Sequence, residues 1–186
     1  WKLDPTNPEI ARQMMRVELG EGKGRKRLEL WFDRAMKLDT SYYAACEAKL
    51  LYLDPKWYGS PDALLEFGRE CVASDTWGGN IPLILMDAHR SLNRYASESG
   101  VTNYWHQPEV WRDIKSAFDK FFLLNPTAVG WHHNYAWYAY EAGEWEEFNK
   151  RLPLLSPVNY SFFGGQTNFE KMVKISRERG TRQPDK

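Results

Sequence analysis

The sequence has little cysteine and no cluster of metal-ligating residues at a characteristic spacing. Its 186 residues contain two cysteines, Cys46 and Cys71, without a CxxC pair or a cysteine–histidine spacing typical of zinc sites. This excludes a disulfide framework and a zinc finger. Both cysteines fall in helix-like stretches, where each is a small buried side chain. The alternative is a disulfide between them, which requires that their helices be antiparallel neighbours.

The sequence also lacks an excess of charge and a long apolar run. Twenty-five Lys and Arg residues balance twenty-five Asp and Glu residues, so the formal net charge is zero. Nucleic acids and anionic membranes normally bind basic surfaces, and we expect neither partner. The longest apolar run, IPLILM at 81–86, is too short to insert into a membrane. Because the chain begins at Trp1 rather than Met, we expect a processed or trimmed piece, and its compartment stays open.

Catalytic motifs are missing as well. The chain has no GxSxG nucleophile elbow and no GxxxxGK[ST] phosphate loop, so we assign no catalytic residue, no cofactor and no metal. The adjacent His132 and His133 diverge on a helix and cannot share a metal ion. A metal site that joins His89, His133 and Glu141 across helices is the remaining alternative. The sequence therefore predicts a protein that is not an enzyme.

Helical periodicity is present throughout the chain, and no alternating strand pattern interrupts it. Ser60, Pro61 and Asp62 supply an N-cap, a first-turn proline and an early acid for one helix. Gly143 separates two further helical stretches. The expected helices span residues 7–19, 25–38, 41–53, 61–74, 80–97, 108–124, 128–142, 144–152 and 167–179.

A helix end recurs along the chain. FDRAMKLDT, FGRECVASD, FDKFFLLNP and FNKRLPLLSP begin at Phe32, Phe67, Phe118 and Phe148, which are 35, 51 and 30 residues apart. The irregular segment 98–107 (ESGVTNYWHQ) accounts for most of the longest interval. Such spacing is typical of stacked helix hairpins that share one continuous core. Each Phe is therefore predicted to be a buried anchor.

The best copy of this repeat, FDKFFLLNPTAVGWHHNYAWYAYEAGEWEEFNK at 118–150, resembles a tetratricopeptide (TPR) unit. Pro126 matches the closing proline of that family, Ala136 the small residue at the helix crossing and Gly143 the turn glycine. Residues 28–40 resemble the end of a second TPR helix. The resemblance implies an all-α fold of about four stacked helix hairpins, an α-solenoid, in one domain over 1–186.

Two further segments bear on this fold. LDPKWYGSPDALLEFGRE, from Leu53, resembles a P-K-W-x-G-S segment of uncharacterised bacterial TPR-like domains. That family supplies no reaction to transfer. The irregular apolar segment 152–165 is expected to fold back over the last hairpin, with 167–179 as the capping helix that a stack requires. Alternatively, Phe162 and Phe163 dock on another chain.

In a TPR-like stack the first helix of each pair lines a concave face. In 128–142, we expect Tyr135 and Tyr138 to fill the core together with Trp131, whereas a second stripe faces the groove or is itself core. Applying the same register to 80–97 and 41–53 extends the groove. The expected groove residues are Lys49, Tyr52, His89, Asn93, His133, Trp137, Tyr140 and Glu141.

An aromatic groove with a few polar groups suits an extended peptide or a short helix. We therefore expect a protein-interaction or scaffold module that binds a peptide or partner protein. One alternative is a helical domain that binds a glycan or other small ligand through exposed Trp and Tyr, such as Trp137 or Trp57. Another is a subunit that serves only to build an assembly.

Overall fold

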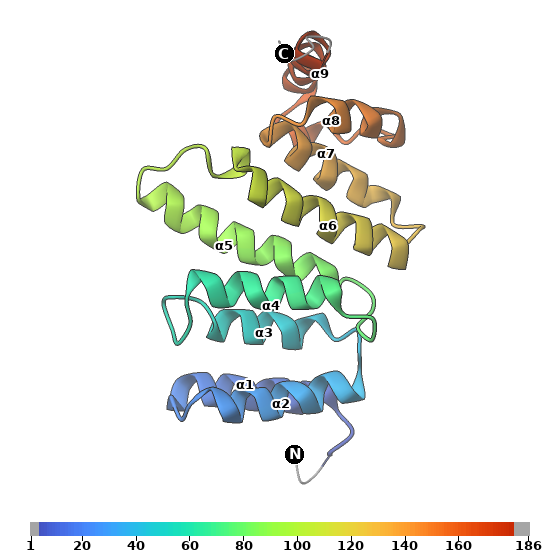
Figure 1. The fold of residues 1–186 in the computed structure, drawn as a ribbon. Helices are drawn as coiled ribbons and strands as arrows, with labels where there is room; N and C mark the ends of the chain where they lie inside the picture. Colours follow the sequence, from blue (N-terminus) through green and yellow to red (C-terminus); the bar gives the residue numbers. More distant parts are fainter. Residues whose placement is uncertain (1–3, 181–186) are drawn as a thin grey trace. The chain divides into compact units, whose positions relative to one another are not determined.

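The computed structural model describes residues 4–180, and this part of the chain is all-α, with no strand (Figure 1). The all-α prediction is confirmed. The α-helices of the described part are α1 (Pro8–Glu21), α2 (Arg25–Leu38), α3 (Tyr43–Tyr52), α4 (Pro61–Ala73), α5 (Ile84–Glu98), α6 (Pro108–Leu124), α7 (His132–Glu141), α8 (Trp145–Arg151) and α9 (Gln166–Gly180).

Local sequence signals predict the boundaries of these helices to within a few residues. The side chain of Ser60 accepts a hydrogen bond from the backbone N–H of Ala63, 3.2 Å away, and α4 begins at the following proline, as predicted. Both α5 and α7 begin later than expected, because a 3₁₀ turn precedes each. These turns span Ile81–Leu83 and Val129–Trp131.

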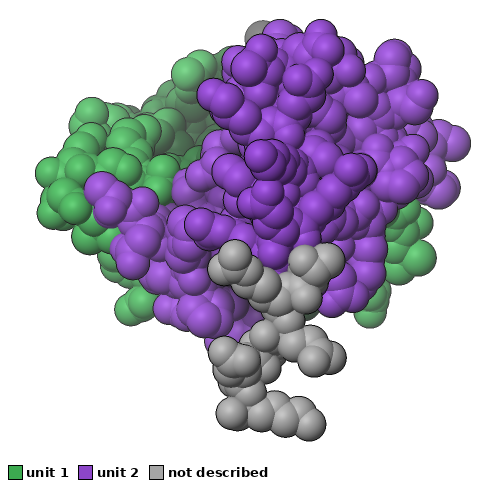
Figure 2. Space-filling view, turned by 90° about the horizontal axis from the view of Figure 1, so that it is seen from above, with its two compact units in different colours: residues 1–101, 113–125 green, residues 102–112, 126–186 purple. Residues whose placement is uncertain are grey.

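The chain divides into two compact units (Figure 2). Unit 1 comprises residues 1–101 and 113–125, and unit 2 comprises residues 102–112 and 126–186. Each unit is described by itself below. The expectation of a single domain stays a prediction.

In unit 1, helices α1, α3 and α5 pack against one another in turn. Helix α3 contacts α1 on one side and α5 on the other, while α2 packs against α1 and α3, and α4 against α5 (Figure 1). The predicted anchors Phe32, Phe67 and Phe118 are buried on α2, α4 and α6. The rings of Phe32 and Phe67 meet edge to face, with centroids 5.6 Å apart. These anchors are confirmed as core residues.

The P-K-W-x-G-S segment forms the turn between α3 and α4. The Asp54 carboxylate accepts a hydrogen bond from the backbone N–H of Lys56, and the Asp54 carbonyl accepts one from Trp57 N–H, at 2.9 and 2.8 Å. A Cβ atom on Gly59 would lie 1.8 Å from the carbonyl oxygen of Leu53, so no other residue fits there. Turn geometry therefore explains the glycine of this segment.

Helices α4 and α5 approach most closely at Gly68. A Cβ atom built on Gly68 would lie 2.8 Å from the Cα atom of Leu85, which is backbone and cannot rotate away. Both residues are buried. Helices α4 and α5 can thus approach this closely only because Gly68 has no side chain at their crossing.

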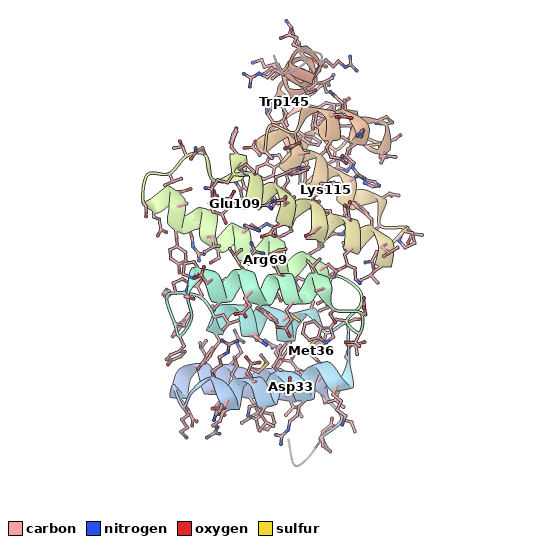
Figure 3. The ribbon with its side chains drawn as sticks, in the orientation of Figure 1. Asp33, Met36, Arg69, Glu109, Lys115 and Trp145 are labelled. Atoms are coloured by element: carbon pink, nitrogen blue, oxygen red, sulfur yellow. The ribbon has the colours of Figure 1, made fainter. Side chains whose placement is uncertain are left out.

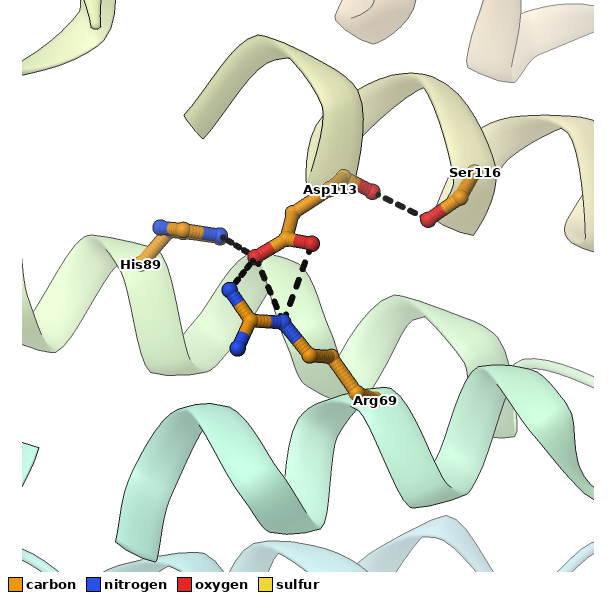
Figure 4. Close-up of polar contacts among 4 residues, drawn as sticks. All are labelled: Arg69, His89, Asp113 and Ser116. Carbon is orange, nitrogen blue, oxygen red and sulfur yellow. Dashed lines mark hydrogen bonds and ion pairs between the residues drawn. The ribbon is translucent and has the colours of Figure 1, made fainter. Parts of the chain in front are cut away.

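A charged cluster joins three helices of unit 1 (Figure 4). Arg69 on α4 donates to both carboxylate oxygens of Asp113 on α6, at 2.8 to 3.1 Å. The Nε2 atom of His89 on α5 lies 3.1 Å from Asp113 Oδ2. Burial would raise the pKa of Asp113, but the hydrogen bonds from His89 and Arg69 outweigh it and lower the pKa. The carboxylate thus stays charged and holds the helices together.

Unit 2 has its own core, formed where α7, α8 and α9 meet the irregular segment 152–165. Phe148, the fourth predicted anchor, is fully buried there beside Ala136. Leu155 and Phe163 from the irregular segment are buried in the same cluster. This confirms that the segment folds back over the last hairpin, although Phe162 remains exposed.

The Asp113 cluster yields a first prediction. Asp113→Ala should lower the free energy of unfolding at pH 7 by about 1 to 3 kcal/mol, because Arg69 and the buried His89 each lose an acceptor. The control Asp119→Ala removes an exposed carboxylate paired only with Lys115 on the same helix, and should cost less than about 0.5 kcal/mol. Urea unfolding measures both values.

The same variant tests the lowered pKa of Asp113. A carboxyl group with a lowered folded-state pKa stabilises the fold above its unfolded pKa of about 3.9, and this stabilisation is lost as the pH falls through the folded value. The difference between wild type and Asp113→Ala should therefore shrink in acid below about pH 4. An undiminished difference at the lowest pH at which the protein is folded would contradict the proposed role of the charge.

Candidate functional site

One face of unit 1 is hollowed by three adjoining depressions that together form a groove. The first lies between α1 and α3, and the second lies between α3 and α5, with a cavity volume of about 410 Å³. The third is lined by the end of α5 and the turn after α3. Adjoining depressions share lining residues, and Leu51 lines all three.

The groove residues repeat with helical spacing. Each of the three first helices contributes residues at positions i, i+4 and i+7, which lie on one side of a helix. In three stripes, each residue of α3 or of the turn after it lies 35 positions after its counterpart on α1 and 40 before its counterpart on α5, whereas other lining residues of α3, such as Ala44 and Ala48, lie outside this pattern. The three stripes are Arg12, Arg16 and Leu19 on α1; Glu47, Leu51 and Asp54 on α3 and the turn after it; and Asp87, Ser91 and Arg94 on α5.

Leu51 is the apolar centre of the groove. Its side chain is 43% exposed, although it lies on a helix whose other faces are largely buried. An isolated exposed leucine is ordinary. Here it stands on the floor shared by three depressions, so a bound chain that covered it would remove apolar surface from water wherever it lay in the groove.

Several charges of the groove are held in place by partners. The Nε atom of Arg12 donates to Glu9 Oε2 at 2.7 Å, and Tyr42 also donates to this carboxylate. These hydrogen bonds, that of Arg12 first, lower the pKa of Glu9 to about 2. Arg12 is thus a fixed cation at the α1 edge of the groove.

Two acidic groups are fixed in the same way. Asp54 accepts hydrogen bonds from Ser91 Oγ at 2.7 Å and from the hydroxyl of Tyr95. Burial would raise its pKa, but these bonds outweigh burial and lower the pKa. Asp87 accepts from Arg90 at 2.6 Å and from the hydroxyl of Tyr43. Both carboxylates are therefore held in place in the groove wall by hydrogen bonds.

Glu47 and Arg16 differ from these groups. Among residues 4–180, neither side chain makes a hydrogen bond or an ion pair, and both line the first depression. Partial burial and the negative charge of Asp87 raise the pKa of Glu47, while Arg12 lowers it. At Glu47, the effect of the negative charge of Asp87 therefore exceeds that of the positive charge of Arg12.

The structure places two of the expected groove residues elsewhere. Lys49 and Tyr52 are only 5% and 2% exposed. The Lys49 ammonium lies 2.7 Å from Glu29 on α2, and it stands over the rings of Phe32 and Phe67, 4.3 and 4.5 Å from their centres. This differs from the expectation that Lys49 faces an open groove, because residues two positions apart lie on opposite sides of a helix.

His89 and Asn93 on α5 show the same shift. His89 is 1% exposed and belongs to the Asp113 cluster, and Asn93 is half-buried. The groove stripe of α5 instead contains Asp87, Ser91 and Arg94. The predicted groove residues of α5 follow the helical period, as the observed ones do, but they lie on a different side of the helix.

In unit 2, the predicted stripe of α7 is partly covered. His133 Nε2 accepts a hydrogen bond from the backbone N–H of Asn159 at 3.1 Å, and its ring lies beside Phe162 and Phe163. The folded-back segment 152–165 thus covers one edge of the His133 ring. This covering is the reason that His133 is not presented as expected.

The remaining residues of that stripe are half-buried within unit 2. Trp137 meets Tyr138 and Trp105 edge to face, at centroid distances of 4.8 and 6.3 Å. Tyr140 packs against Phe148, and burial raises its pKa. Glu141 also has a raised pKa because of burial, which the charge of His106 partly offsets. Trp137 and Tyr140 both border the core of unit 2 rather than an open surface.

Cys46 and Cys71 are free and buried. The Sγ atom of Cys46 lies 3.9 Å from Met36 Sδ, and Figure 3 shows Met36 on α2 directed toward α3. Burial, followed by the hydrogen bond with Cys46, raises the pKa of the Cys71 thiol, which makes the thiolate unfavourable. The two thiols are thus inert packing groups.

Comparison with protein-family models, with curated proteins and with solved structures finds no match for this chain. None of the helices in residues 4–180 has both the length and the apolarity needed to cross a membrane. In the same range, no three His, Cys, Asp or Glu side chains are grouped in a way that could hold a metal ion.

The three stripes that line the groove were not predicted from the sequence, although their residues follow a regular spacing. The triplets R-x₃-R-x₂-L, E-x₃-L-x₂-D and D-x₃-S-x₂-R recur at intervals of 35 and 40 residues. Each triplet lines the groove, although Asp54 lies in the turn after α3 and is itself buried. Only the first position of the triplet, occupied by Arg12, Glu47 and Asp87, is charged in all three copies, so a search for recurring charged positions would have pointed to that position alone.

The position of Lys49 leads to a second prediction. Lys49→Ala should lower the free energy of unfolding by about 2 to 4 kcal/mol, because it removes a buried cation, its two ring contacts and the partner of Glu29. Lys115→Ala, which removes an exposed lysine of the same unit (Figure 3), should cost less than about 0.5 kcal/mol. Chemical denaturation compares them. If Lys49 instead faced an open groove, Lys49→Ala and Lys115→Ala would lower the free energy of unfolding by equally small amounts.

Proposed function

We propose that this chain is a peptide- or protein-binding module and that the α1/α3/α5 groove of unit 1 is its binding face. The observation that carries the proposal is the continuous groove, whose walls come from equivalent positions of three successive first helices. We propose further that the helix pairs stack in the manner of tetratricopeptide repeats. The 35-residue interval between the stripes of α1 and α3 supports this, because it equals the interval between Phe32 and Phe67.

The lining of the groove favours an extended peptide. An exposed leucine at its centre provides apolar contact, while fixed carboxylates and cations provide orientation. The fixed groups are already hydrogen-bonded, so binding costs little reorganisation of the protein. Function rests on these features of the site, not on the fold class.

The third prediction concerns Leu51. Selection from a display library of random 16-residue peptides should enrich peptides that bind wild type, and Leu51→Arg should weaken the best of them at least tenfold. The reason is that arginine fills the shared floor and removes the apolar contact. Fluorescence polarisation with labelled peptides measures the dissociation constants.

The matched control is Leu123→Arg on α6. Leu123 is 75% exposed and lies outside the groove, so this variant should bind like wild type. Both variants should melt within a few degrees of wild type, since both positions are on the surface. The proposal fails if no peptide is enriched, or if the enriched peptides bind Leu51→Arg as well as wild type.

Glycan binding is a second candidate, which the position of Trp57 favours. Trp57 is 43% exposed and lines the third depression together with Tyr95. If a sugar ring stacks on this indole, an oligosaccharide from a glycan panel should change the tryptophan fluorescence saturably, and Trp57→Ala should abolish the change. A panel without any saturable response would eliminate this candidate.

A further inference from the structure

The charges of the groove change sign along its length. The first depression is lined by two cations of α1, Arg12 and Arg16, and one carboxylate, Glu47, and is therefore positive. The second is lined by three carboxylates and one cation, and is therefore negative. Those lining groups are Glu47, Asp54, Asp87 and Arg94.

Most of these charges already have partners within unit 1. Asp54 and Asp87 are hydrogen-bonded on both oxygens, and Arg12 is bound to Glu9. In the first two depressions, Glu47 and Arg16 are the charges left without a hydrogen bond or ion pair among the described residues. A partner of complementary charge would therefore place a cation at Glu47 and an anion at Arg16.

We propose that the groove binds an extended peptide segment in which a lysine or arginine enters the second depression at Glu47 and an aspartate or glutamate reaches Arg16. This inference rests on the proposed function, because it specifies the ligand of the same groove. The basic side chain also covers Leu51 with its methylene groups on the way to Glu47.

The spacing of the two charges in the peptide follows from the helix packing. Neighbouring packed helices lie about 8 to 10 Å apart. In an extended chain, residues i and i+2 point to the same side and are separated by about 7 Å. Long charged side chains cover the remaining distance. The ligand therefore carries an acidic and a basic residue two positions apart, in either order.

The test begins with the random 16-residue peptide library selected on wild-type protein. The enriched peptides should contain an acidic and a basic residue two positions apart more often than the input library does. For a labelled peptide of this class, Glu47→Lys should weaken binding at least tenfold, and so should replacement of the peptide's basic residue by Gln.

Two matched measurements complete the design. Glu66→Lys makes the same charge change at an exposed position of α4 outside the groove, and it should leave the affinity within about twofold. A peptide whose basic residue is replaced by glutamate should bind Glu47→Lys better than it binds wild type. Such a reversal is expected only if the two groups meet, because a merely structural role of Glu47 would not produce it.

The outcomes separate the two proposals. Suppose that peptides are enriched and that Leu51→Arg no longer binds them, which supports the groove. If these peptides contain no basic residue, or if they bind Glu47→Lys as tightly as wild type, the charge assignment is overturned and the binding groove stands. If no peptide is enriched, or if Leu51→Arg retains binding, the groove itself is refuted together with the charge assignment.

Discussion

The Lys49 ammonium lies between the rings of Phe32 and Phe67, with the Glu29 carboxylate 2.7 Å away. Three helices meet at this point, because Glu29 and Phe32 lie on α2 and Phe67 on α4. A buried ammonium without such partners would be strongly unfavourable. Its position therefore fixes the rotation of α3 about its own axis, and the faces that α3 presents elsewhere follow from that rotation.

His89 occupies the equivalent place on α5, 40 residues later, and it meets Asp113 as Lys49 meets Glu29. In both first helices a basic side chain is directed toward a carboxylate on a second helix. The opposite side of each first helix is left for the stripe of the groove. The interior contacts between these basic side chains and carboxylates, and the surface groove, are thus two results of one helix orientation.

Local signals were sufficient to predict the helices and their anchors. The boundaries of α2 and α6 and the burial of all four recurring phenylalanines follow from periodicity, caps and prolines, which act within a few residues. The face of each first helix could not be predicted in this way. On α3, Lys49 is buried and Leu51 is exposed, whereas lysines are usually exposed and leucines usually buried. The reason is the contact of Lys49 with Glu29, which lies 20 residues earlier in the chain and is therefore not a local signal. The cover on His133 likewise comes from a distant part of the sequence, because Asn159, which donates a hydrogen bond to its ring, lies 26 residues later.

Gly68 has a consequence for reading sequence variation in this protein. Its place against the Leu85 backbone tolerates no side chain, yet it lies in the interior and takes no part in the groove. Selection would preserve such a glycine as strictly as a ligand-contacting residue. By contrast, Glu47 and Arg16, which support nothing in the fold, would be free to vary whenever the ligand changed. Invariance among relatives of this chain would therefore mark its helix crossings, whereas the binding specificity that we propose would be recorded in positions that vary together.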